Sequence, residues 1–131
     1  MITLRELDAT TSLAQQLDAT TGPVTVVASY LVPEQALTAF LALWQADAAV
    51  LTAAPGFRRT SLHRATAGGQ LLWSVAEWES TQALAAAVAA GAADETVRRC
   101  QAAITADIDG YLTVFHSAAL AEVTAQPHRR D

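Results

Sequence analysis

The chain has 131 residues, a formal net charge of −5, 52% hydrophobic side chains and only 16% charged ones. This length is typical of one domain that needs no disulfide or metal for stability. The acidic balance and the scattered arginines argue against a nucleic-acid partner, and no apolar run reaches the roughly 18 residues that a membrane span needs.

Residues 1–22 are predicted to form an N-terminal arm that ends at Gly22-Pro23. Leu13 and Leu17 would place one short helix in it, with Thr11 or Ser12 as the cap. The first residues lack the basic start, apolar centre and cleavage site of a secretory signal. We therefore expect a cytoplasmic protein.

VTVVASYL, residues 24–31, is rich in β-branched side chains, which favours a strand. Pro33 suits the first turn of a helix that would end near Ala53, before Pro55. The helix shows the apolar spacing typical of one buried face, at Leu37, Phe40, Leu41 and Trp44.

FRRTSLHRAT, residues 57–66, alternates but is polar on both faces, which favours an edge strand. Gly68-Gly69 provides a turn into QLLWSVAEW, residues 70–78. Two strands so close in the sequence are expected to form an antiparallel hairpin.

Ser80 is a suitable cap for a second helix, with Leu84 and Val88 on its inner face until Gly91 interrupts it. Asp94 would cap a further helical piece with Val97, Ile104 and Ile108 on its apolar stripe. GYLTVFHSAALAEV, residues 110–123, would be the last strand.

The predicted element order is β-α-β-β-α-β, which indicates an α+β, ferredoxin-like fold. We expect a four-stranded antiparallel sheet with helices on one face and no intrachain cover on the other. The domain would span residues 23–124, and residues 125–131 would form a C-terminal tail.

Two tryptophans lie five positions apart in the 70–78 strand, so their rings must point to opposite faces of the sheet. Trp73 is assigned to the helix-covered face as a core residue, and Trp78 to the open face. Small side chains accompany Trp78 at Ser74 and Ala76, and the gap beside them calls for either a partner subunit or a ligand.

Five short motifs together resemble the antibiotic biosynthesis monooxygenase (ABM) domain family. They are VTVVASYLVPEQ, the APGF turn, the LHR that ends the second strand, AEWES and FHS. The resemblance implies a dimeric α+β barrel, hence a homodimer. It also implies cofactor-independent oxygenation of an aromatic, polyketide-like substrate by O₂, from phenol or anthrone to quinone.

Trp78 matches the tryptophan of the third strand in the quinone-forming members, and Arg98 falls where their arginine would be. Both are therefore candidate catalytic residues. Ser74 replaces the family's asparagine, and Leu84 replaces its tyrosine. The remaining candidates for substrate binding or proton transfer are Leu72 on the Trp78 face and the histidines His63 and His116.

Several alternatives stay open at this point. Haem-degrading relatives carry a first-strand asparagine and a second-helix histidine, both of which this sequence lacks. A polyketide cyclase, or a non-catalytic dimer that binds a small aromatic molecule, would need only the shaped cavity. Cys100 is the only cysteine, and there is no dinucleotide fingerprint or P-loop, so we expect no cofactor and no metal.

Overall fold

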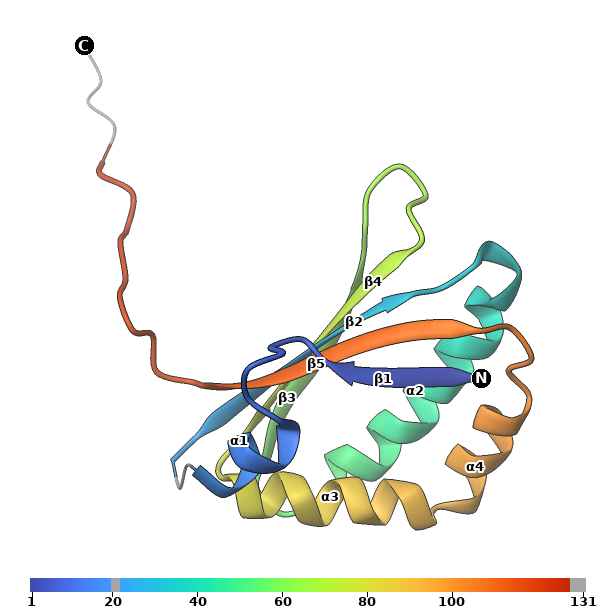
Figure 1. Cartoon of the computed structure of the whole chain (residues 1–131), viewed down its shortest axis with the longest axis horizontal. Coiled ribbons are helices and arrows are strands. Elements are labelled where there is room, and N and C mark those ends of the chain that lie inside the picture. The colour runs from blue at the N-terminus through green and yellow to red at the C-terminus, as the bar shows by residue number, and fades with distance from the viewer. Residues whose placement is uncertain (20–21, 128–131) are drawn as a thin grey trace.

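The computed structural model describes residues 1–19 and 22–127 as one sheet with helices below it (Figure 1). The strands and helices follow in the order β1 (Ile2–Glu6), α1 (Leu13–Ala19), β2 (Val24–Leu31), α2 (Leu37–Thr52), β3 (Phe57–Arg64), β4 (Leu71–Trp78), α3 (Thr81–Ala93), α4 (Glu95–Ala102) and β5 (Ile108–His116). A short 3-10 turn, Glu34–Ala36, precedes α2.

The sheet has five strands in the order β1-β5-β2-β4-β3. Strands β2 to β5 pair antiparallel and reproduce the predicted ferredoxin-like arrangement, with β3 at the edge. The expectation of a sheet with only four strands, all antiparallel, was wrong, because β1 adds a parallel strand beside β5. β1 has only five residues, and it is recognisable as a strand through its pairing with a segment about 105 residues away, as in Ile2 opposite Ile108.

Helices α2, α3 and α4 lie on one face of the sheet, as expected, and α1 contacts β5 and α3 at the side (Figure 1). Gly91 does not interrupt α3, which continues to Ala93, and α4 ends at Ala102, so that Ile104 follows the helix and Ile108 begins β5. Within the described part of the chain, no helix has both the length and the apolar character needed to cross a membrane.

Side-chain caps begin three of the helices where the sequence predicted them. The Ser12 hydroxyl accepts a hydrogen bond from the Gln15 amide, and the Gln15 side chain accepts one from the Ser12 amide in return, which forms a capping box. The Ser80 hydroxyl accepts from the Ala83 amide, and the Asp94 carboxylate accepts from the Val97 amide. The two-piece helix after Ser80 therefore follows from Asp94 as a second start signal.

The last strand is shorter than predicted, because β5 ends at His116 rather than near Val123. The Ser117 amide still donates to the Pro23 carbonyl, but residues 118–127 have no strand partner. This segment runs away from the sheet, and its Leu120 and Val123 side chains are fully exposed (Figure 1).

The assignment of the two tryptophans to opposite faces is confirmed, but the choice of face was wrong. Trp78 is 1% exposed and packs with Val24 and Leu84 on the helix-covered side. Trp73 is 42% exposed on the open face. Strand alternation separates the two rings, but only the docking of the helices decides which set of side chains is covered.

Candidate functional site

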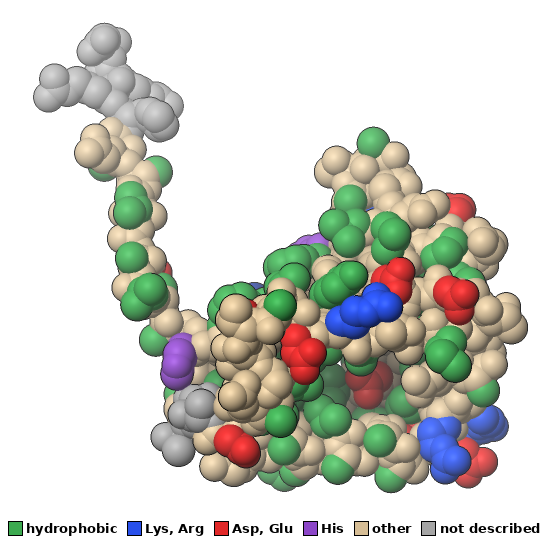
Figure 2. Space-filling model, viewed as in Figure 1, with side chains coloured by type: hydrophobic (Ala, Val, Ile, Leu, Met, Phe, Trp, Pro, Cys, Tyr) green, Lys and Arg blue, Asp and Glu red, His purple; other side chains and the backbone are tan. Residues whose placement is uncertain are grey.

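A cavity of about 400 Å³ lies between the sheet and helices α2 and α3. In the space-filling view a hollow opens between β1 and α3, with an acidic side chain inside it (Figure 2). All five strands and the helices α1, α2 and α3 contribute to the lining. It comprises Leu4, Arg5, Glu6, Leu13, Val26, Ala28, Tyr30, Trp44, Asp47, Ala48, Leu51, Thr60, Ser74, Ala76, Trp78, Leu84, Val88 and Leu112.

The central strands leave room for the cavity because their inward side chains are small. Ala28 on β2 lies opposite Ser74 on β4, and Val26 lies opposite Ala76 in the next inward pair. Larger side chains at these positions would fill the space between the sheet and α2. The gap predicted beside the Trp78 ring therefore exists, but on the helix side of the sheet.

Trp78 forms one wall of the cavity and is also part of the core. Its ring meets the Phe57 ring edge-on, with centroids 5.4 Å apart and an interplanar angle of 75°. Edge-to-face packing holds an aromatic ring in one orientation. With 1% of its surface exposed, the indole is a fixed part of the cavity wall that its core neighbours cover almost completely, rather than a movable side chain.

Ser74 and Trp44 connect the sheet to α2 through a hydrogen bond. The Trp44 indole N–H donates to the Ser74 hydroxyl oxygen at 3.3 Å. Because an indole N–H can only donate, the Ser74 oxygen is the acceptor and its own hydrogen remains available. The cavity therefore contains one hydroxyl donor held by a half-buried partner.

Asp47 and Tyr30 add ionisable groups to the same lining. Burial, and to a smaller extent the nearby Asp94 carboxylate, raises the pKa of Asp47 above its ordinary value of 3.8. Burial, followed by the charge of Asp47, raises the pKa of Tyr30 above 10.0. The phenol is therefore a hydrogen-bond donor at neutral pH, and the carboxylate is a stronger base than an exposed aspartate.

The cavity mouth is formed partly by the N-terminal segment. Arg5 and Glu6 of β1 line it, and α1 contributes Leu13. The Arg5 guanidinium donates to the Asp109 carboxylate at 3.0 Å, and the Glu6 carboxylate accepts from the Leu13 amide at 3.4 Å. The predicted arm is thus part of the cavity wall.

The structure brings three of the seven predicted site residues together, namely Trp78, Ser74 and Leu84. The other four are not among the lining residues. Leu72 is 2% exposed and packs in a separate core cluster with Phe40, Arg98 is exposed on α4, His63 is exposed on the open face beside Ser61, and His116 is exposed at the end of β5. These four residues therefore lie away from this cavity, because spacing along the chain does not show which end of an element reaches it.

Three cavity residues were missed by the sequence analysis, and two of them had a detectable signal. Trp44 belongs to the apolar stripe of α2, and Asp47 follows it by three positions, so an acidic residue lies on the inward face of a helix. Tyr30 shares the inward face of β2 with Ala28. Tyr30 lines the cavity only because the helices cover this face of β2, and the sequence alone did not show which face they cover.

A wider groove of about 930 Å³ lies between α2 and α3 on the outer side of the helices. Alanine methyl groups dominate its lining, and it contains no aromatic ring. Within residues 1–19 and 22–127, no group of three or more His, Cys, Asp and Glu residues is arranged to hold a metal ion. The cavity beneath β2 and β4 combines rings with ionisable groups, as does a smaller cavity of about 210 Å³ that shares Leu4, Tyr30, Trp44 and Asp47 with it.

Comparison with known proteins gives the family and the fold. The family model described as "Antibiotic biosynthesis monooxygenase" matches residues 23–99, which is more than half of the chain. No curated protein sequence matched.

Solved structures share the fold at low sequence identity. SnoaB from Streptomyces nogalater, a cofactor-independent oxygenase, is 24% identical with a TM-score of 0.60, covering 77% of this chain and 99% of its own. Rv0793 from Mycobacterium tuberculosis is 24% identical with a TM-score of 0.56, covering 78% and 99%. A conserved protein from Methanosarcina mazei is 11% identical with a TM-score of 0.57, covering 75% and 95%. With the family model matched over most of the predicted domain, this chain belongs to the antibiotic biosynthesis monooxygenase family.

Proposed function

We propose that this chain is a cofactor-independent monooxygenase that uses O₂ to convert a flat, polyketide-like phenol or anthrone into a quinone. The observation that carries the proposal is the cavity of about 400 Å³, in which Trp78, Trp44 and Tyr30 surround a few polar groups. Such a lining suits a ring-shaped small molecule. Membership of the family, and a fold shared with a cofactor-independent oxygenase, support the same class of reaction.

The substrate supplies all the electrons in this reaction. In an anthrone, the CH₂ group that lies opposite the carbonyl in the central ring loses a proton, and the electron pair is delocalised through the aromatic rings onto the carbonyl oxygen as an enolate. The enolate transfers one electron to O₂, the two radicals join through a C–O bond, and the protonated peroxide then loses water. The balance is one CH₂ plus one O₂ to one C=O plus one H₂O, so no flavin, haem or metal is required.

The side chains of the cavity have distinct tasks in this scheme. The half-buried Trp44 and Tyr30 rings offer contact surface to the substrate ring, and the buried Trp78 indole fixes the shape of the wall. The Ser74 hydroxyl, whose oxygen already accepts from Trp44, donates its hydrogen to the enolate oxygen, and the Tyr30 phenol is a second donor. Leu84 packs against the ring. The proposed site thus leaves out Leu72, Arg98, His63 and His116.

A second candidate function is a non-catalytic or cyclase-type barrel that binds a small aromatic molecule. Ser74 and Leu84 favour it, because they replace the asparagine and tyrosine that the family resemblance would place in the site. A binding protein needs only the rings and the shape of the cavity.

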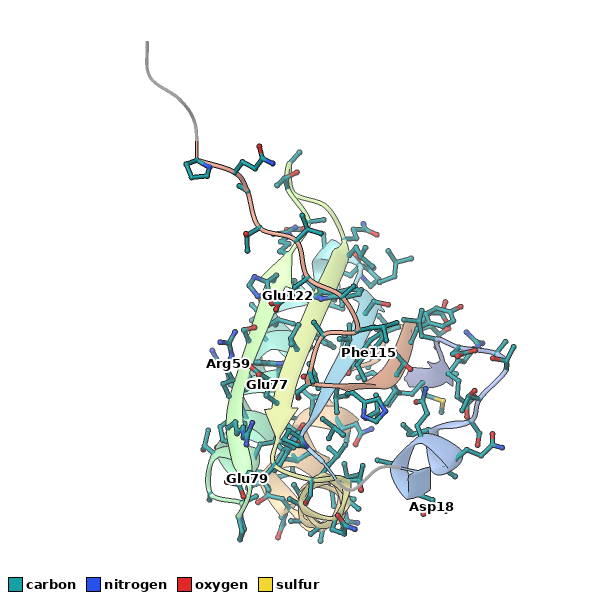
Figure 3. All side chains as sticks on the ribbon, turned by 90° about the vertical axis from the view of Figure 1, so that its left-hand side faces the viewer. Asp18, Arg59, Glu77, Glu79, Phe115 and Glu122 are labelled. Carbon is teal, nitrogen blue, oxygen red and sulfur yellow. The ribbon has the colours of Figure 1, made fainter. Side chains whose placement is uncertain are left out.

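We further propose that the protein is a homodimer that pairs through the open face of the sheet. This face exposes the large side chains of Leu71, Trp73, Tyr111 and Phe115, each at least 38% exposed. In Figure 3, Phe115 lies on this face at β5, and the Arg59–Glu77 ion pair of 2.6 Å lies toward the β3 edge of the sheet. An apolar patch of this kind is typical of an association surface. The cytoplasmic location remains a prediction of the sequence.

Oxygen consumption tests the proposed function. Chelator-treated protein is mixed with an anthrone, and O₂ uptake and quinone absorbance are followed together. We expect uptake above the spontaneous rate, with one O₂ consumed per quinone and no hydrogen peroxide released. Quenching of tryptophan fluorescence without O₂ uptake would identify a binder instead, and a ring-closed product formed without O₂ would identify a cyclase.

A further inference from the structure

Asp47 is a carboxylate inside the cavity to which none of the residues 1–19 and 22–127 donates a hydrogen bond. The other carboxylate of the lining, Glu6, already accepts from the Leu13 amide. Asp47 is half-buried, and none of the described residues has a side-chain oxygen that is both fully buried and unpaired, so solvent still reaches this carboxylate through the cavity. A carboxylate that has no protein donor and is open to an aromatic cavity is therefore available to a ligand.

The position of Asp47 is set by α2 and α3. It follows Trp44 by three residues, so both side chains project from the same side of α2, and Trp44 is held by Ser74. On α3, a Cβ atom at Gly91 would lie 2.8 Å from the Asp47 Oδ1 atom. The absence of a side chain at Gly91 thus gives the carboxylate its space.

We propose that the Asp47 carboxylate is the general base that removes a proton from the enolisable substrate. This inference rests on the proposed function and names the group that starts the reaction. The substrate C–H bond breaks, an O–H bond forms on Asp47 Oδ, and the electron pair remains on the substrate as the enolate. Ser74, on the opposite wall, is placed to donate to the enolate oxygen at the same time.

The charges around Asp47 favour this task. Tyr30 of β2, Asp94 at the start of α4, and Arg5 and Glu6 of β1 are the ionisable groups that face it or line the same cavity. Burial and the Asp94 charge raise the pKa of Asp47. A general base with a pKa nearer to the working pH is more effective than an exposed aspartate.

Anaerobic exchange of the substrate C–H for deuterium isolates the proton step from the oxygen step. Anthrone in D₂O without O₂ is followed by NMR with wild-type protein and with Asp47→Asn. We expect wild type to accelerate the exchange and Asp47→Asn to lower that acceleration by about 100-fold or more. Asp18→Asn, which changes an exposed carboxylate on α1 (Figure 3), should leave it unchanged.

Asp94→Asn provides an independent measurement through pH. Asparagine is as good an N-cap as aspartate, so α4 keeps its start signal. Loss of the Asp94 charge lowers the pKa of Asp47, and the exchange rate, which requires ionised Asp47, should then rise at a lower pH than in wild type. This shift also decides the question if Asp47→Asn does not fold.

The possible outcomes test separately whether Asp47 is the general base and whether the chain is a monooxygenase. Exchange lost in Asp47→Asn, without O₂ uptake by wild type, would keep Asp47 as the base and overturn the monooxygenase. Exchange or O₂ uptake that persists in folded Asp47→Asn, or an unshifted pH profile in Asp94→Asn, would overturn the base. O₂ uptake by wild type without any anaerobic exchange would also overturn it, and wild type that does neither would overturn both.

Discussion

At the scale of single residues, the cavity combines packing and chemistry in the same side chains. Trp78 belongs to the buried core and also presents its ring to the cavity, whereas Trp73 lies on the far side of the sheet. Substitutions of Trp78 and of Trp73 should therefore have different effects on stability and on ligand affinity.

Trp78→Phe should lower the free energy of unfolding by about 1–3 kcal/mol, because a smaller ring leaves a void beside Phe57 and Leu84. It should also weaken the binding of a naphthol or anthrone, measured by fluorescence quenching. Trp73→Phe should leave ligand affinity unchanged, since the sheet separates that ring from the cavity. Equal affinities of the Trp78→Phe variant and wild type would remove Trp78 from the site.

Asp47→Asn should change how stability depends on pH. The raised pKa means that folded Asp47 binds its proton more tightly than the unfolded chain does, so the unfolding free energy falls as the pH rises from about 4 through the folded pKa. Asparagine does not titrate, so the Asp47→Asn variant does not lose this part of its unfolding free energy as the pH rises. Urea unfolding should show the variant more stable than wild type at pH 7, with a difference that shrinks toward pH 4. A difference independent of pH would contradict this.

At the scale of elements, the approach of α2 to α3 is set by small side chains. Asp47 on α2 lies against Gly91, which α3 includes in spite of its low helix propensity. The predicted start signals of the two helical pieces were confirmed, since Ser80 begins α3 and Asp94 begins α4. The contact between Asp47 and Gly91 was not predictable, because it joins residues 44 positions apart on different helices.

Gly91→Ala tests this contact. Alanine favours the helix by up to about 1 kcal/mol, so the fold should be retained. Its methyl group, however, would lie 2.8 Å from the Asp47 carboxylate and should turn it away from the cavity. We expect thermal stability near that of wild type, with slower anaerobic exchange of anthrone. Gly22→Ala is the control, since nothing lies within 4 Å of a Cβ there.

At the scale of the whole molecule, the sheet has one face covered by helices of the same chain and one face exposed. The open face exposes Trp73, Tyr111 and Phe115. The C-terminal segment, with the exposed Leu120 and Val123, leaves the sheet at the end of β5 and runs away from it (Figure 1). Such exposed apolar side chains on two separate surfaces are costly for a monomer in water.

Sedimentation of the wild-type chain should therefore give a dimer, and Trp73→Glu should shift it to the monomer because a carboxylate would be buried between two sheets. Leu41→Glu changes a similarly exposed side chain on α2, 37% exposed, and should leave the dimer intact. A wild-type chain that sediments as a stable monomer at micromolar concentration would overturn the pairing.

The sequence by itself determined the local features of this protein. β-branched runs, apolar spacing and caps at Ser12, Ser80 and Asp94 are decided by neighbouring residues, so β2, α2, the β3-β4 hairpin and the two-piece helix were predicted correctly. Alternation also separated Trp73 from Trp78, because it follows from strand geometry alone.

Only the tertiary structure decided which face of the sheet the helices cover, and with it where the cavity lies. That choice depends on packing between segments far apart in the chain, as in the pairing of β1 with β5 and the bond from Trp44 to Ser74. For the same reason, only the tertiary structure showed that Asp47 and Tyr30 line the cavity and that Arg98 does not. Local sequence specifies an element and its two faces, whereas the choice of the buried face is made by the whole chain when it packs.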